Sequence, residues 1–171
     1  QKSHQVSKMS DAGDKLMSYV DFTKALGEAY LNNEWKKYIC NYLMMHYGVR
    51  NKDLNLEIVK TKKEMKDGEN YLLLKKDKVV YIRDDYKTHK TYGKKTHEIH
   101  DNIFHECVKK AGVGKLIAEA QISNGLRKLY INKHNEAKVF KMMIDHYYDK
   151  DDSASIKRLA ADRGTSLSVV Q

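Results

Sequence analysis

Apolar residues recur three and four positions apart through most of the chain, which is the spacing of one face of an α-helix. This pattern predicts helices over residues 21–31, 33–46, 51–59, 101–111, 114–121, 125–132, 136–148 and 156–162. Gly48 and Gly164 are expected to end two of these helices, and Ser153 to cap the last. Ser166 is expected to cap a further helix that starts just before the sequence ends.

A second pattern appears between residues 60 and 99. The runs YLLL, VVYI and KTHEI are rich in β-prone residues and are separated by turn-forming residues. They predict a small three-stranded antiparallel sheet. Together with the helices, this indicates an α+β fold that is mostly α.

The length of 171 residues favours one compact domain. Residues 1–18 are polar and without period and are interpreted as a flexible leader or linker, so the domain is expected to span 19–171. Because the sequence opens with Gln1 and carries no secretory signal pattern, we expect it to be part of a longer intracellular protein. The longest apolar runs are about six residues, which is too short to cross a bilayer, so no membrane partner is expected.

Two cysteines, Cys40 and Cys107, lie in apolar helical patterns without C-x-x-C spacing. We expect both to pack in the core as free thiols, in a reducing compartment. His97, His100, His105 and Cys107 have the residue types that zinc prefers, but their spacing places them on different faces. No metal site is therefore predicted.

The net charge of +9 and the pI of about 9.3 favour a polyanionic partner, with nucleic acid the first interpretation. Residues 60–95 hold twelve of the basic residues and only six acids, so they carry +6 of that charge. A lysine-rich sheet edge can simply discourage aggregation; the alternative is a hairpin that lies along phosphates. Under that alternative, the residues expected to contact DNA are Lys75, Lys76, Lys78, Lys90, Lys94 and Lys95.

One helix end carries candidate chemistry. Gly48, Arg50 and Asp53 follow the helix over 33–46, and the acid stands three residues after the arginine, where it is expected to pair with and orient the guanidinium. An arginine at a helix end is most often only a partner of the helix dipole. The later segments therefore decide the interpretation.

Those segments are a basic hairpin with Lys87, Thr88 and Lys90, then a helical region with Leu126 and Arg127, then the turn at Gly164. With the G-x-R-x-x-D stretch before them, this order resembles the catalytic domain of tyrosine recombinases, the phage-integrase-like family. The resemblance covers roughly residues 20–171.

The resemblance implies a metal-free and cofactor-free transfer of a DNA phosphodiester to a tyrosine, through a 3′-phosphotyrosine intermediate. Arg50 and Arg127 would clamp the non-bridging oxygens, as planar guanidiniums do. Lys87, or Lys90 as the second candidate, would protonate the departing 5′-oxygen. The implied partner is duplex DNA, on which the full-length protein would act as a homo-oligomer.

The chain departs from the family pattern at several places. Asn124 stands where the family usually has His or Lys, and Thr165 stands in place of a late histidine, with Arg163 beside it as a substitute donor. The nucleophilic tyrosine is expected a few residues beyond Gln171, so this sequence by itself is expected to bind DNA without cleaving it.

Three alternatives stay open. A telomere resolvase or a type IB topoisomerase shares the same active-site logic. A DNA-binding protein on the same scaffold that has lost catalysis would account for Asn124 and Thr165. A basic helical protein with chance motifs is the remaining interpretation.

Overall fold

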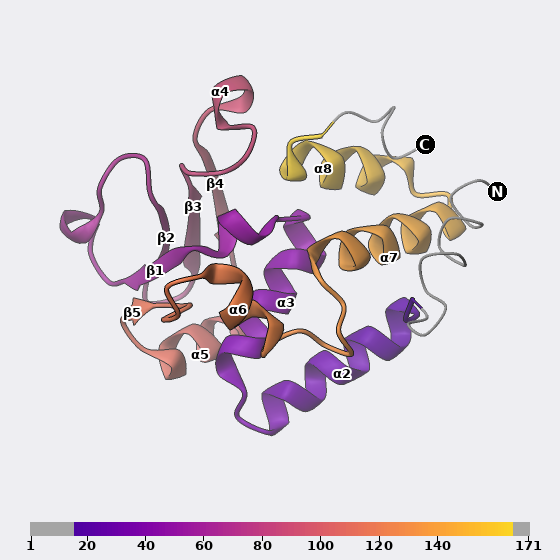
Figure 1. The fold of residues 1–171 in the computed structure, drawn as a ribbon, viewed down its shortest axis with the longest axis horizontal. Helices are drawn as coiled ribbons and strands as arrows, with labels where there is room; N and C mark the ends of the chain where they lie inside the picture. Colours follow the sequence, from indigo (N-terminus) through magenta and orange to yellow (C-terminus); the bar gives the residue numbers. More distant parts are fainter. Residues whose placement is uncertain (1–15, 166–171) are drawn as a thin grey trace.

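The protein is described here by a computed structural model, which covers residues 16–165 and packs helices beside a mixed sheet (Figure 1). The α-helices are α2 (Tyr19–Leu31), α3 (Trp35–Tyr47), α4 (His89–Tyr92), α5 (Asn102–Ala111), α6 (Ile122–Arg127), α7 (Glu136–Asp149) and α8 (Ser153–Arg163). Two short 3-10 helices are η1 (Asn51–Leu54) and η2 (Lys62–Glu64). The strands are β1 (Leu56–Val59), β2 (Asn70–Leu74), β3 (Val79–Arg83), β4 (Lys95–Ile99) and β5 (Gly114–Lys115). The predicted α+β class is confirmed.

The ends of the helices follow local chemistry. Asp101 and Asn135 cap α5 and α7 by accepting hydrogen bonds from backbone N–H groups of the first turn. Gly48 and Gly164 end α3 and α8 in the left-handed conformation, as predicted. The expected cap of α8 was wrong by one residue: Asp152, not Ser153, accepts the hydrogen bond from the backbone of the first turn.

The sheet has five strands in the order β4-β3-β2-β1-β5, so the expected number of three was too small. The three predicted strands are present as β2, β3 and β4, and their pairing is antiparallel as expected. The helix predicted over 51–59 was right only at its start, where η1 forms; residues 56–59 instead pair in parallel with β2. The helix predicted over 114–121 was also wrong, because it begins as β5 on the other edge of β1. Helix α6 ends at Arg127, earlier than the predicted 132.

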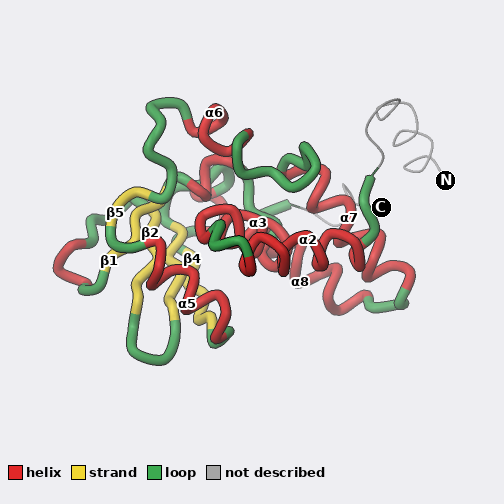
Figure 2. The backbone as a smooth tube through the Cα atoms, turned by 90° about the horizontal axis from the view of Figure 1, so that it is seen from below, coloured by secondary structure: helices red, strands yellow, loops and turns green. Residues whose placement is uncertain are grey.

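Buried residues lie on both faces of the sheet. Leu72, Tyr81 and Ile99 face the main core, where they meet α3 and the other helices. Tyr71 and Leu73 point the opposite way into a smaller cluster. Helix α3 lies at the centre of the molecule and contacts α2, α5, α7 and α8 (Figures 1 and 2). Both cysteines are buried and free, which confirms that they pack in the core as free thiols.

The connections at the two ends of the sheet separate the basic residues. The β2–β3 turn, with Lys75, Lys76 and Lys78, lies at one end of these strands, beside α5. The segment between β3 and β4, residues 84–94 with α4, lies at the other end, close to the end of α8 (Figure 1). The lysines expected to contact DNA therefore divide into two groups at opposite ends of the sheet.

The start of the described chain is anchored to the core. Leu16 and Met17 pack against it, and the Met17 amide donates a hydrogen bond to Nε2 of the buried His134. Most of the expected leader, and the helix expected from Ser166, lie outside the described residues. Within residues 16–165, every helix is too short or too polar to cross a bilayer.

Candidate functional site

The segment after α3 is tied to the end of α8 by a reciprocal pair of arginines. Arg50 Nη1 donates a hydrogen bond of 2.7 Å to the carbonyl oxygen of Arg163. In return, Arg163 Nη1 donates one of 3.1 Å to the carbonyl oxygen of Gly48. A Cβ at Gly48 would lie 3.1 Å from the Phe140 ring, so glycine suits both the left-handed backbone and the close packing here. The resemblance to the family named Arg50 and Arg163, and the structure brings them together.

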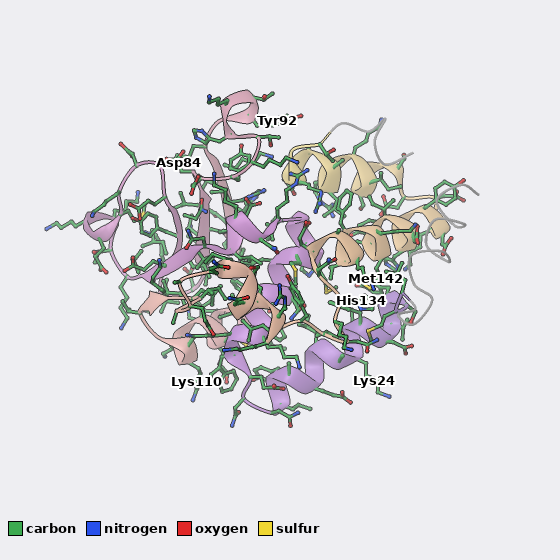
Figure 3. All side chains as sticks on the ribbon, in the orientation of Figure 1. Lys24, Asp84, Tyr92, Lys110, His134 and Met142 are labelled. Carbon is green, nitrogen blue, oxygen red and sulfur yellow. The ribbon has the colours of Figure 1, made fainter. Side chains whose placement is uncertain are left out.

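Lys95, at the start of β4, reaches the same turn of α8. Its Nζ donates hydrogen bonds to the carbonyl oxygens of Ala161 and, at 3.2 Å, Asp162. The ammonium lies 5.4 Å from the ring centre of Tyr86 and 5.0 Å from that of Tyr92, which extends from the α4 segment (Figure 3). Partial burial lowers the pKa of Lys95, and the charge of Arg83 lowers it further.

Arg50 and Lys95 therefore hold three successive carbonyls, those of residues 161–163. These are the last carbonyls of a helix, which carry its partial negative charge, and cations are favoured there. The two side chains come from different elements but end at one place. Burial lowers the pKa of Arg50, and the nearby charge of Arg163 adds to the effect.

Below Arg50 lies a fully buried ion pair. Arg83 Nη2 donates to Asp53 Oδ2 at 2.8 Å, and the two side chains are 0% and 1% exposed. The same Asp53 oxygen accepts a 3.2 Å hydrogen bond from the backbone N–H of Arg50. The expected pairing of Asp53 with the Arg50 guanidinium was wrong: the carboxylate fixes the Arg50 backbone, and its charge is paired with Arg83. Burial raises the pKa of Asp53, while Arg83 opposes that rise.

Sequence reasoning missed Arg83 because it stands at the end of an apolar strand, where it contributed only to the charge of the hairpin. Its Nη1 lies 3.3 Å from Nε2 of His97 on the neighbouring strand β4. Burial, with the charges of Arg83 and Lys95, lowers the pKa of His97 to about 4. The signal that could have identified this pair was a charged residue inside a run of residues that otherwise reads as buried.

Arg163 is held from a second side. It forms an ion pair of 2.7 Å with Glu136 at the start of α7, and its guanidinium lies 4.5 Å from the Phe140 ring centre. Its side chain is therefore committed to joining α3, α7 and α8. Thr165 follows the helix end, and its backbone N–H donates to the Ala160 carbonyl.

Arg127 lies at the end of α6, with an exposed side chain that makes no hydrogen bond or ion pair within residues 16–165. Helix α6 contacts η1, the segment that follows Arg50. The chain just after α6 is also joined to η1, because the Tyr130 hydroxyl donates a 3.4 Å hydrogen bond to Asn51. Asn124 is exposed on the same helix. The described contacts thus place Arg127 on an element next to η1 but do not join its guanidinium to that of Arg50.

The predicted hairpin lysines do not meet Arg50 through any described contact. Lys87, Lys90 and Lys94 are exposed around α4. The neighbouring Thr88 hydroxyl is buried against Gly164. Lys95, which the sequence placed only in the DNA-contacting set, is the hairpin lysine that the structure brings to the site.

The His and Cys residues first considered for zinc face separate partners. His97 faces Arg83, His100 faces Glu98, and His105 Nε2 lies 2.7 Å from the carbonyl oxygen of Lys75. In the part of the chain that the structure describes, no three His, Cys, Asp or Glu side chains are grouped to hold a metal ion.

The chain matches none of the protein-family models, curated proteins or solved structures with which it was compared. Arg50, Arg83, Lys95 and Arg163 bring four cationic groups to one end of α8, against the carboxylates of Asp53 and Glu136. Arg83 and Arg163 are neutralised by these carboxylates, whereas Arg50 and Lys95 are bonded to backbone carbonyls and form no ion pair among the described residues. These two are therefore the cations whose charge an anionic ligand such as a phosphodiester could neutralise.

Proposed function

We propose that this chain is the catalytic domain of a DNA breaking and rejoining enzyme that works like the tyrosine recombinases. The observation that carries the proposal is the meeting of Arg50 and Lys95 on the last carbonyls of α8. This is the position from which the chain runs into Gly164 and Thr165, and so toward the segment in which the resemblance expects the nucleophile. Arginine and lysine from distant elements converge on that place, which supports a phosphate-handling role.

In the proposed reaction, a tyrosine hydroxyl attacks the phosphorus of a backbone phosphate. The bond from phosphorus to the 5′-oxygen breaks, and a lysine gives its proton to that oxygen. Arg50 and Arg127, on neighbouring elements, stabilise the negative charge that grows on the non-bridging oxygens. The tyrosine hydroxyl releases its own proton to water, and the lysine recovers a proton from water, so atoms and charge balance. The reverse of the same steps rejoins the strand without an added cofactor.

Three lysines are candidates for the general acid. The resemblance points to Lys87 or Lys90, whose side chains are exposed and make no hydrogen bond or ion pair with the described part of α8. The contacts favour Lys95, because its ammonium reaches the end of α8. Its lowered pKa also makes that ammonium a better proton donor near neutral pH. A substrate with sulfur in place of the bridging 5′-oxygen separates the three, since a thiolate leaves without protonation. Only the alanine variant of the true general acid should regain its rate on that substrate.

The proposal is tested with a polypeptide of the same gene that continues past Gln171. Incubated with a half-site duplex, it should form a covalent protein–DNA adduct, and R50A and R127A should each reduce adduct formation by at least about a hundredfold. The controls are K24A and K110A, which remove a charge on α2 and α5 away from the site (Figure 3). An adduct unchanged by R50A would overturn the proposal.

A second candidate is a DNA-binding protein on this scaffold without catalysis. Asn124 and Thr165 favour it, because neither offers the cationic or imidazole donor of the family. Duplex binding with normal dependence on Arg50, together with no adduct in the longer polypeptide, would favour this candidate over the enzyme.

A further inference from the structure

The strongest feature outside the proposed phosphate contacts is the chain of buried polar groups behind Arg50. It runs from His97 on β4 to Arg83 on β3, then to Asp53 in η1, and from there to the Arg50 backbone. Each link crosses to another element, and Arg83 and Asp53 are shielded from water. Burying charged groups in such a network costs free energy of desolvation, so a network beside a candidate site suggests a role in that site.

We propose that His97 and Arg83 position Arg50 for phosphate binding by fixing Asp53, and that His97 does so as the neutral Nδ1–H tautomer. The inference rests on the proposed function, because it assigns Arg50 the task of binding phosphate. Neither His97 nor Arg83 touches the phosphate in this scheme, so both are positioning residues.

The tautomer follows from hydrogen-bond chemistry. A guanidinium has donors and no acceptor, so Nε2 of His97 must accept from Nη1 of Arg83, and the ring proton must be on Nδ1. The groups that face this ring are Arg83 and Tyr81 from β3, Lys95 from its own strand, and Tyr47 from α3, whose ring centre lies 4.4 Å away. Two of these are cations and none is an anion, so protonation of the His97 ring to the cationic form is opposed from both strands.

The orientation of Arg83 follows from the same contacts. Nη1 points to His97 while Nη2 points to Asp53, so the two partners hold the planar group at two corners. The guanidinium carbon also lies 5.1 Å from the ring centre of Tyr86. Asp53 is held in turn by Arg83, and its Oδ2 accepts the Arg50 N–H. Loss of the acceptor at position 97 would free one corner and let Arg83 and Asp53 turn together.

The test measures how much Arg50 contributes to duplex binding in three backgrounds. H97Q keeps an acceptor at nearly the same place and does not titrate, whereas H97F keeps an aromatic ring beside Tyr47 and removes the acceptor. Duplex dissociation constants are measured at pH 7 by fluorescence anisotropy for each background with and without R50A. R50A is expected to weaken binding by about tenfold in the wild type and in H97Q, and by less than about threefold in H97F.

Equal effects of R50A in all three backgrounds would overturn the positioning role and leave the proposed function standing. No effect of R50A in the wild type would instead remove Arg50 from phosphate binding, and with it both the proposed function and this inference. If H97F does not fold, nitrogen NMR of the His97 imidazole in the wild-type protein decides: a protonated Nδ1 with an unprotonated Nε2 is expected, and the opposite tautomer or a doubly protonated ring at pH 7 would contradict the inference.

Discussion

At the scale of single residues, burial decides what each charge does. Asp53 and Arg83 are both shielded from water, so each depends on the other for its charge to be stable. The exposed pair of Lys128 and Glu119 has the same 2.8 Å distance, but water competes with it. Two ion pairs of equal length are therefore expected to differ greatly in their contribution to folding.

Replacing Asp53 with Asn should lower the free energy of unfolding by about 3–5 kcal/mol, because the charge of Arg83 is left buried without a counter-charge. The matched control is Glu119→Gln, which removes a carboxylate at the surface and should cost less than about 1 kcal/mol. Urea denaturation measures both. Equal losses for the two variants would show that the Asp53–Arg83 pair is not shielded as described.

The lowered pKa of His97 makes stability depend on pH. Since the folded protein holds the pKa at about 4, below the ordinary value of 6.5, the unfolded chain binds a proton first as the pH falls. The contribution of His97 is full above about pH 6.5 and is lost between pH 6.5 and 4, with a slope of at most about 1.4 kcal/mol per pH unit. Urea titrations of the wild type and H97Q over this range should diverge as the pH falls. Parallel curves would contradict the neutral buried state of His97.

At the scale of elements, the end of α8 is where the fold brings the site together. Its last carbonyls accept from Arg50 and Lys95, and Gly164 then turns the chain in the left-handed conformation against Thr88. The α4 segment is thus in contact with the helix end rather than free above it. Any side chain at position 164 would strain the left-handed backbone and would overlap Thr88.

Gly164→Ala should therefore destabilise the protein by more than the roughly 1 kcal/mol of a glycine with positive φ, since its Cβ would overlap the Thr88 hydroxyl. Gly68→Ala is the control, because Gly68 has nearly the same φ of +81° and open space around it. Thermal unfolding of both variants gives the comparison. If Gly68→Ala costs as much, the contact between α4 and α8 does not matter for stability.

Across the protein, the lysines expected to contact DNA do not form one continuous positive surface. Lys87 and Lys90 lie in the segment between β3 and β4, which meets the end of α8 through Thr88 and Gly164. Lys75 and Lys76 lie in the β2–β3 turn at the other end of the sheet, beside α5. Under the proposed function, a duplex bound at the end of α8 would lie beside the first group. The two groups carry equal charge, so they form a matched pair for testing where the duplex lies.

Double alanine substitution of Lys87 and Lys90 should weaken duplex binding and reduce the slope of log K against log salt by about 2, since each phosphate contact releases about 0.9 counterion. The same change at Lys75 and Lys76 should leave the slope close to that of the wild type. Dissociation constants between 50 and 200 mM salt, at roughly five concentrations, are sufficient to see this. A larger change from the Lys75 and Lys76 variant would place the duplex at the other end of the sheet.

Sequence patterns alone predicted α2, α3, α5, α7 and α8, three of the strands and the helix ends at Gly48 and Gly164, because apolar spacing and glycine conformation act over a few neighbouring residues. They also located Arg50 and the concentration of charge in the hairpin. These are properties that local chemistry can express without knowledge of the fold.

Strand pairing, the partner of each buried charge and the lysine that meets α8 all depend on residues far apart in the chain, so they became visible only in the folded structure. Residues 56–59 became a strand because β2 offers a parallel partner, which overrode their helix-like spacing. Asp53 pairs with the Arg83 guanidinium rather than with that of Arg50, because Arg83 is fully buried and opposite charges attract more strongly away from water. Lys95 rather than Lys87 reached α8 because β4 aims it there, and no spacing within the sequence encodes which lysine of a hairpin meets a helix more than sixty residues later.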